Sequence, residues 1–335
     1  MHIGKAYRWR EFLHWTRRKA LLLLAYGLVP VTLYQVVGLR WLTVPVAVVA
    51  ILGTAAAFIV GFKNAQTLSR LLEAQQIWTS IHSSGRYFGS ITRDFVPDAV
   101  AARTLALRHI AWVTALRYEL RSPRVWETVD EGANAEYQVH YRIPERETSL
   151  SEELHRLLSD DESASVIESS SRPHCVLDLQ SRAITKLTAQ GTISVSYALE
   201  LRKVVKEANE QQGRAERLKN FPYPRQYAVI NTLFVWAFCL LLPLGLLREF
   251  DRLNDGLSGL MQGVMVWLVV PFSAMISWMY TVLEQVGNST ENPFEGSAND
   301  VPISHIAATL EHEMLITHGE KSTCAVPKPL NDIIL

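Results

Sequence analysis

The 335-residue chain has few cysteines and no excess of charge of either sign. Its cysteines, Cys175, Cys239 and Cys324, are scattered and form no CxxC pair, which argues against a disulfide framework and a zinc site. Basic and acidic residues number 33 each, so no basic field favours a nucleic-acid partner. The sequence also lacks P-loop, GxGxxG and GxSxG motifs, and no nucleophile is arranged beside a base. We therefore expect neither an enzyme nor a nucleic-acid-binding protein.

Histidines and acids are frequent near the C-terminal end, but their spacing does not fit metal ligation. His305 and His312 lie seven residues apart, and His312 and His318 lie six apart, so none has the i, i+4 spacing of HExxH. Together with Glu311 and Glu313, they are better explained by an exposed amphipathic helix. We expect no metal site and no cofactor.

A second polar cluster, ENPFEGSAND at 291–300, offers carboxylate and amide oxygens around a proline turn. Such oxygens are the ligands that calcium prefers. In the alternative interpretation, the Asn and Asp side chains cap a helix that starts near Ile303. The acids are separated and too few to fill a calcium shell, which favours the capping interpretation.

Long apolar segments alternate with polar ones along the chain. Residues 42–62 contain no charge and are about long enough to cross a bilayer as a helix. The whole pattern predicts an all-α membrane protein with four transmembrane helices, at 20–39, 42–62, 228–247 and 260–283. It divides the chain into an N-terminal segment, a transmembrane hairpin, a large helical region, a second pair of spans and a tail: 1–19, 20–62, 63–226, 227–283 and 284–335. The basic N-terminal segment places both termini in the cytoplasm by the positive-inside rule.

The second span continues without a turn signal into the polar region, so one helix is predicted from about Leu42 to Trp78. Two of its faces differ. One has a small residue at every fourth position, which allows another helix to approach closely: Gly53, Ala57 and Gly61. The next face has a hydroxyl and two aromatic rings in one line: Thr54, Phe58 and Phe62. Around an axis shared by several copies, this line would form a hydrophobic constriction of the kind that gates channels. Alternatively, the two rings pack against lipid or a neighbouring helix.

The polar region is predicted to be mostly helical. The apolar spacing of a helix occurs at 64–82, 97–120, 150–159 and 173–219. The stretch SSGRYFGS (83–90) is expected to separate the first two helices, and residues 159–172 are expected to form an exposed loop. The two prolines of FPYPRQY (221–227) should break the helix before the third span.

Three stretches resemble the bacterial branch of the bestrophin family: GFKNAQTLSRLLEAQQIW (61–78), FPYPRQY (221–227) and ENPFEGSANDVPISHI (291–306). They are similar to its glycine–phenylalanine–basic–asparagine stretch, its Pro-x-Pro-x-x-Tyr entry to the third span and its Asn-Pro-Phe tail signature. The resemblance covers residues 5–320 and keeps the family's order of motifs. It implies a homopentamer in the bacterial inner membrane, with the second span of each subunit around one pore.

The resemblance also implies where the pore narrows. Family members have a hydrophobic neck of three residues, one turn apart, which the GF motif places at Thr54, Phe58 and Phe62. A second, cytoplasmic constriction falls on Ser196 by counting back from the Pro-x-Pro motif without gaps, with Ile193 or Tyr197 as alternatives if the register shifts. This chain departs from the family by having a hydroxyl at the outermost neck ring and at Ser196.

Calcium gating is not expected. Animal bestrophins follow Asn-Pro-Phe with a run of acids that clasps calcium and opens the pore. Here Glu295 and Asp300 are separated by Gly-Ser-Ala-Asn, so the acidic run is missing.

The expected function is passive conduction of ions through the pore, with anions such as chloride as the permeant ions. Phenylalanine ring edges are electropositive and favour an anion, and animal bestrophins pass chloride. The predicted pore line carries no charge, so a sodium-selective channel of the same fold is an alternative. A membrane-anchored scaffold or sensor without conductance is another. A secondary transporter is disfavoured because the sequence shows neither inverted repeats nor charges inside the spans.

Overall fold

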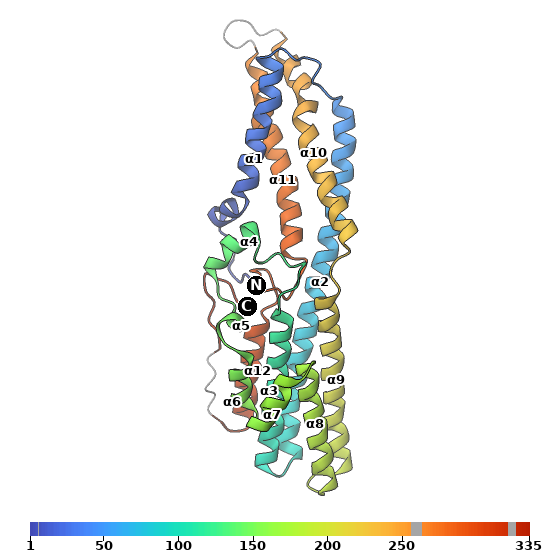
Figure 1. Ribbon diagram of the computed structural model, residues 1–335, viewed down its shortest axis with the longest axis vertical. Coiled ribbons are helices and arrows are strands. Elements are labelled where there is room, and N and C mark those ends of the chain that lie inside the picture. The colour runs from blue at the N-terminus through green and yellow to red at the C-terminus, as the bar shows by residue number, and fades with distance from the viewer. Residues whose placement is uncertain (6, 256–262, 321–325) are drawn as a thin grey trace.

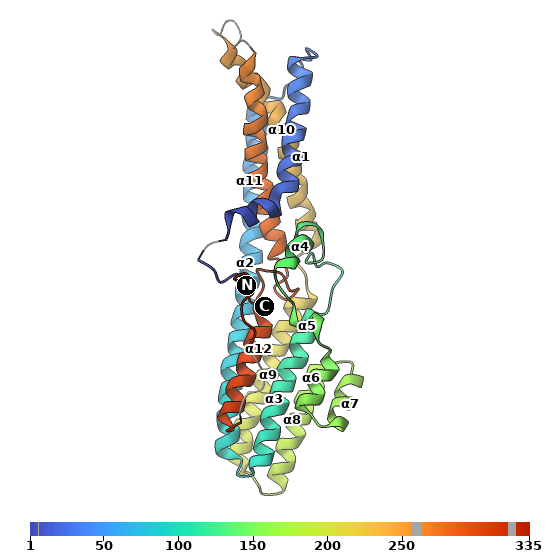
Figure 2. The same ribbon diagram turned by 90° about the vertical axis from the view of Figure 1, so that its left-hand side faces the viewer.

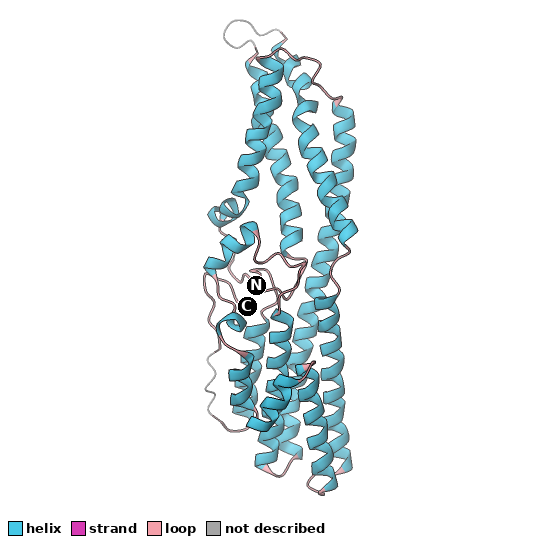
Figure 3. Ribbon diagram, in the orientation of Figure 1, coloured by secondary structure: helices cyan, strands magenta, loops and turns pink. Residues whose placement is uncertain are grey.

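The computed structural model describes residues 1–5, 7–255, 263–320 and 326–335. The long helices are α1 (Trp9–Gln35), α2 (Val46–Phe95), α3 (Ala99–Arg121), α8 (Arg172–Ala189), α9 (Val195–Asn220), α10 (Arg225–Asp251), α11 (Val269–Ser289) and α12 (Ile303–Thr317). The short helices are α4 (Gly132–Tyr137), η1 (Gln138–His140), α5 (Pro144–Glu147), α6 (Leu150–Leu157), α7 (Asp160–Glu168), η2 (Arg252–Asn254) and η4 (Val264–Leu268). Within these described residues, β-structure is limited to isolated bridges (Figure 3). The predicted all-α fold is confirmed.

Two bundles lie end to end along the long axis of the molecule (Figure 1). The apolar bundle contains α1, α10, α11 and the first half of α2, and the polar bundle contains the second half of α2 with α3, α6, α7, α8, α9 and α12. Among the described residues, three helical segments are long and apolar enough to cross a membrane: Val46–Phe95, Arg225–Asn254 and Val264–Ser289.

The predicted first span, α1, is not among these three segments. Its N-terminal part contains Arg17, Arg18 and Lys19, which shorten the apolar part of the helix. It nevertheless packs along α11 and against α10, and both views place it beside these helices (Figure 2). Within the described parts of the chain, the long helices of the apolar bundle are therefore α1, the first half of α2, α10 and α11, in the chain order that the sequence predicts.

Helix α2 is 50 residues long and runs through both bundles without a break. At 1.5 Å per residue it is about 75 Å long. The glycine-containing stretch 83–90, expected to interrupt the helix, is part of it. Gly85 and Gly89 remain helical because α12 packs onto them: an added Cβ would lie 2.7 Å from Leu310 at Gly85 and 3.4 Å from Met314 at Gly89. These glycines serve close helix packing and do not form a turn.

Two further segments differ from expectation. Residues 159–172, predicted as an exposed loop, contain α7, whose first turn holds three acids that the helix dipole stabilises: Asp160, Asp161 and Glu162. Val166 of α7 is fully buried. The helical pattern at 173–219 divides into α8 and α9 because Gly191 follows α8 with a φ of +70°, a conformation that ends helices.

The core of the polar bundle forms around Trp78 of α2 and Trp112 of α3, both fully buried. The indole N–H of Trp112 donates to Gln212 Oε1 of α9 at 3.0 Å, so its polar atom is satisfied inside the core. Helix α12 packs against both α2 and α3. These contacts fix the second half of α2 from one side.

Glycines bring α2 and α10 together in the apolar bundle. An added Cβ at Gly53 would lie 2.6 Å from the ring of Phe238, and one at Gly245 would lie 2.8 Å from Val49. The hydroxyl of Tyr280 in α11 donates to the carbonyl of Gly53 at 3.2 Å. One side of α2 is thus covered by α10 and α11, and its opposite side stays exposed.

Candidate pore face and junction network

The predicted neck residues lie on the exposed side of α2. The residues Phe58 and Phe62 are 66% and 69% exposed, and Thr54 is exposed one turn before them. The Thr54 hydroxyl donates to the carbonyl of Ala50 at 2.9 Å, so its proton is held within the helix. Two large rings exposed one turn apart form an apolar surface that lipid, another helix or a narrow pore must cover.

A shallow hollow of about 440 Å³ lies between these rings. It is lined by Ala57, Phe58, Gly61, Phe62 and Ala65. None of these side chains carries a polar atom, so the surface offers an ion no replacement for its hydration shell.

The small-residue ridge of α2, formed by Gly53, Ala57 and Gly61, lies in two environments. Gly53 is covered by Phe238 within the subunit. Ala57 is exposed, and none of the described residues lies within 4 Å of the position that a Cβ at Gly61 would take. The end of the ridge nearest the polar bundle therefore has room for a helix from outside the subunit.

The three alternatives for the second constriction lie around the start of α9. Ser196 is the second residue of this helix and is exposed. Tyr197 is also exposed, and its ring stacks on Phe95, the last residue of α2, with centroids 4.3 Å apart. Ile193 is buried in the core of the subunit.

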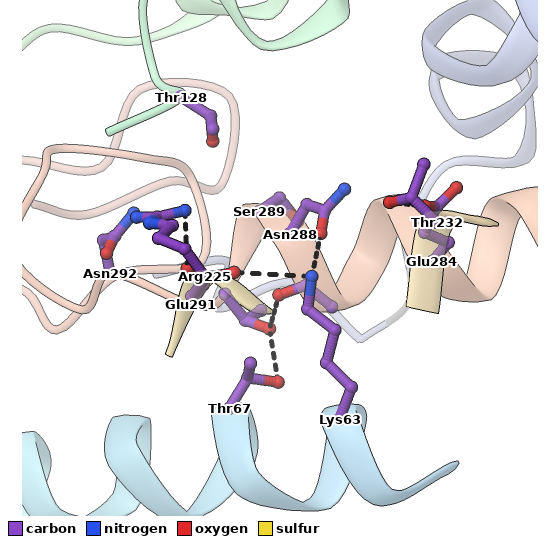
Figure 4. A network of polar contacts seen from close by, with 12 residues as sticks. Lys63, Thr67, Thr128, Arg225, Thr232, Glu284, Asn288, Ser289, Glu291 and Asn292 are labelled. Atoms are coloured by element: carbon purple, nitrogen blue, oxygen red, sulfur yellow. Dashed lines mark hydrogen bonds and ion pairs between the residues drawn. The ribbon is translucent and has the colours of Figure 1, made fainter. Parts of the chain in front are cut away.

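A network of charged and polar groups, here called the junction network, joins the middle of α2 to the start of α10 and the end of α11, close to the residues predicted to form the neck (Figure 4). The side chain of Lys63, the first charged residue after the apolar run, is 3% exposed. Its ammonium binds Asn288 Oδ1 and lies 3.4 Å from Glu291 Oε2. The other oxygen of Glu291 lies 3.3 Å from the guanidinium of Arg225. The network thus connects α2 with the start of α10 and the end of α11.

A third cation, Arg70, reaches the same place from α2. Its guanidinium donates to the carbonyl of Glu291 at 3.2 Å and to the carbonyl of Leu218 at 2.8 Å. A separate buried acid, Glu284, accepts from the Thr232 hydroxyl at 2.6 Å. Polar contacts therefore join the apolar and polar bundles at this place, next to the apolar face of α2 that carries Phe58 and Phe62.

Comparison with known proteins agrees with the arrangement of the helices. Residues 15–316 match the sequence profile of the bacterial/fungal bestrophin proteins. The chain belongs to this bestrophin family. This bestrophin is 24% identical over 288 residues to the voltage-dependent anion channel-forming protein YneE of Escherichia coli K12, over 86% of this chain and 80% of YneE. It is 20% identical over 280 residues to the voltage-dependent anion channel-forming protein mll4386 of Mesorhizobium japonicum, over 84% of this chain and 76% of that protein.

A solved structure shares the fold. The crystal structure of a bacterial bestrophin homolog from Klebsiella pneumoniae superposes with a TM-score of 0.76 at 23% sequence identity, over 91% of this chain and 99% of that one. The predicted family and fold are confirmed, and the protein is a membrane protein of the bestrophin fold.

The Asn-Pro-Phe loop of this bestrophin is buried and closely hydrogen-bonded. Asp300 Oδ2 accepts from the Gly296 N–H at 2.6 Å and lies 3.0 Å from the guanidinium of Arg121, while Oδ1 accepts from the Ser297 hydroxyl at 2.7 Å. Helix α12 starts at Ile303 as predicted, but its N-cap makes no side-chain hydrogen bond. The capping interpretation is therefore wrong for Asp300, because its oxygens are engaged by the loop and by α3.

Glu295 of the same loop has one engaged and one free oxygen. Oε2 accepts from the Thr128 N–H at 3.0 Å and from the Asn292 amide at 3.3 Å, whereas Oε1 has no hydrogen-bond partner among the residues that the structure describes. Burial, with the nearby charge of Asp300 adding to it, raises the pKa of Glu295 well above its ordinary value. A raised pKa makes this carboxyl a weaker ligand for a metal ion, because metal binding requires the deprotonated form.

The histidines and acids near the C-terminal end are dispersed among separate partners. Glu313 lies 3.1 Å from His82, and His318 lies 3.2 Å from the Thr92 hydroxyl. Within the described parts of the chain, no three metal-ligating side chains are grouped to hold an ion. The prediction that they form an exposed helix is wrong, because α12 packs between α2 and α3 and even Glu311 is buried, paired with Arg156.

Reasoning from the sequence did not find the junction network. From the sequence, Glu291 was considered only as a candidate calcium ligand. A signal was available, since Lys63 is the first charge after one apolar run, Arg225 is the last before the next, and Glu291 follows the last run. Opposite charges at the ends of spans that meet in one bundle indicate pairing across the helices.

Proposed function

We propose that this bestrophin is a passive anion channel and not an enzyme, formed by five copies around a pore lined by α2. The observation that carries the proposal is the pair of exposed rings, Phe58 and Phe62, on the side of α2 that its own bundle leaves free. Copies arranged around an axis would bring these rings together. The names of the relatives in E. coli and M. japonicum, both anion channel-forming proteins, support the same function.

In this arrangement Thr54, Phe58 and Phe62 form the neck. Their rings would present electropositive edges to a passing ion, which favours chloride over sodium. Because the apolar rings hold water poorly, the neck would close by dewetting. The Thr54 hydroxyl makes the outermost ring the easiest to wet.

The second constriction is assigned to Ser196. It is exposed near the far end of the polar bundle, whereas Ile193 is buried and cannot face a pore without repacking the core. Calcium gating is not part of the proposal, because the loop and Arg121 already engage both oxygens of Asp300 and burial raises the pKa of Glu295.

The polar bundle and both termini are assigned to the cytoplasm of a bacterial cell, with the apolar bundle in the inner membrane. The basic cluster Arg17, Arg18 and Lys19 lies in the N-terminal part of α1, before its apolar run, which agrees with the positive-inside rule.

Reversal potentials test the sign of the permeant ion. Purified protein in a planar bilayer with a NaCl gradient should reverse close to the chloride equilibrium potential, and micromolar calcium on either side should leave the current unchanged. Reversal near the sodium potential would overturn anion selectivity and leave the pore in place. A bilayer without current, with protein of the correct mass inserted, would favour a scaffold or sensor.

Leucine at Gly61 tests the assembly. Its side chain has room within the subunit, so the subunit should fold, but it would occupy the space assigned to a neighbouring helix. Mass measurement in detergent should show loss of the pentamer. Gly213→Leu is the matched control, because this helical glycine of α9 also has nothing within 4 Å. A Gly61→Leu variant with unchanged mass and conductance would contradict the assigned interface.

A further inference from the structure

A cavity of about 520 Å³ opens beside the junction network, between α2, the start of α10 and the end of α11. Its lining has two chemically different parts. The part next to the network is polar and contains charges of both signs: Lys63, Thr128, Arg225, Thr232, Asn288 and Glu291. The part that continues along α10 is apolar: Val229, Leu233 and Trp236.

Positive charge exceeds negative charge around the polar part. Lys63, Arg225 and Arg70 all contact Glu291, the first two through its carboxylate and the third through its carbonyl. Three cations against one carboxylate leave an excess of two positive charges among these groups. Lys63 is buried, where an uncompensated charge is costly, and Arg225 is half-exposed, where an anion can reach it.

Neighbouring acids do not supply this compensation. Each already has its own cation, in the pairs Glu284–Lys19, Glu73–Arg217 and Glu127–Lys219. Helix α10 adds to the positive field, since it begins at Arg225 with no side-chain cap on its N-terminal amides. The polar part of the cavity is therefore built to hold an anion.

The cavity lies at the depth of the lipid headgroups. Lys63 directly follows the charge-free run of α2. Asn288 lies at the C-terminal end of α11, the end that faces the polar bundle. Trp236 is 11 residues along α10 from Arg225, which is about 16 Å of helix toward the membrane centre. This distance corresponds to the distance between the phosphate of a lipid headgroup and the first part of its acyl chain.

We propose that this cavity binds an anionic phospholipid, with its phosphate on Arg225 at the edge of the junction network and one acyl chain along Val229, Leu233 and Trp236. A free anion would use only the polar part and would leave Val229 and Leu233 exposed at 66% and 63%. A lipid uses both parts. The site is separate from the predicted neck and does not depend on whether the protein conducts.

Lipid binding is measured by native mass spectrometry of the full-length protein in detergent, with phosphatidylglycerol as the probe. Arg225→Gln removes one charge from a half-exposed position and should weaken binding about fivefold, the effect of one basic residue at a membrane surface. The matched control is Arg248→Gln, an exposed arginine at the opposite end of α10, which should bind as the parent does. Arg225→Lys keeps the charge and should retain most of the affinity.

A second arm separates a lipid from a free anion. Leu233→Thr should weaken phosphatidylglycerol binding without changing the response to inorganic phosphate, because only an acyl chain contacts that wall. Thermal unfolding of the parent should rise with phosphatidylglycerol and stay unchanged with millimolar inorganic phosphate.

Three results would overturn the assignment. Equal lipid affinity of the parent, Arg225→Gln and Leu233→Thr would place the lipid elsewhere. Stabilisation by inorganic phosphate alone would make this an anion site. A lower oligomer mass for Leu233→Thr would show that a second copy of the chain covers this face. Should Arg225→Gln not fold, the comparison of Leu233→Thr with the parent decides.

Discussion

Alanine at both Phe58 and Phe62 is expected to raise ion flux through the reconstituted channel about tenfold or more. The two rings present an apolar surface with no polar atom, so an ion crosses them without replacement for its hydration shell. Removing both rings widens the passage and lets water remain. A tenfold change corresponds to about 1.4 kcal/mol of barrier, a small part of the cost of dehydrating an ion.

The measurement is ion flux from liposomes that contain equal amounts of folded protein. Phe234→Ala is the control, because this aromatic of α10 packs against the core of the apolar bundle and is not part of the exposed face of α2. It should lower stability and leave permeation per folded channel unchanged. If Phe234→Ala raised the flux and the double variant did not, α2 would be the wrong pore helix.

Methionine at Arg121 is expected to destabilise the fold by about 3–5 kcal/mol. The guanidinium of Arg121 lies 3.0 Å from Asp300 and 3.5 Å from Glu145, and all three side chains are almost fully buried. The substitution keeps the volume but leaves two buried carboxylates with less compensation. Arg117, 2.9 Å from Glu145, can offset only part of this loss.

Thermal and chemical unfolding in detergent will measure this loss. The control is Arg93→Met, because Arg93 pairs with Asp94 on the surface, where solvent screens the interaction. The control should unfold as the parent does. Equal unfolding midpoints for Arg121→Met and Arg93→Met would mean that the buried cluster around Asp300 does not anchor the Asn-Pro-Phe loop.

Patterns with a single physical cause were predictable from the sequence. The prolines at 222 and 224 marked a real boundary, between α9 and α10, because the missing proline amide acts locally. The face with Phe58 and Phe62 followed from helical spacing alone, and the structure leaves it exposed.

Features that depend on a distant neighbour were not predictable. Gly85 and Gly89 look like turn residues until α12, more than 200 residues later, is seen to pack onto them. Residues 159–172 look like a polar loop until Val166 is seen to be buried against the bundle. The partners of Lys63 likewise come from a helix that ends more than 220 residues away. The local sequence determines the secondary-structure propensity of each segment. It does not determine which distant surface that segment will pack against.

The unbroken course of α2 also has a mechanical consequence. A single helix of 50 residues carries the aromatic rings near one end and the contacts with α12 at the other, with no hinge between them. Phe62 and Gly85 lie 23 residues apart on this helix, which is about 35 Å, so a tilt of about 3° displaces one relative to the other by about 2 Å. A small shift in the packing of α12 on Gly85 would therefore move the aromatic rings without bending α2.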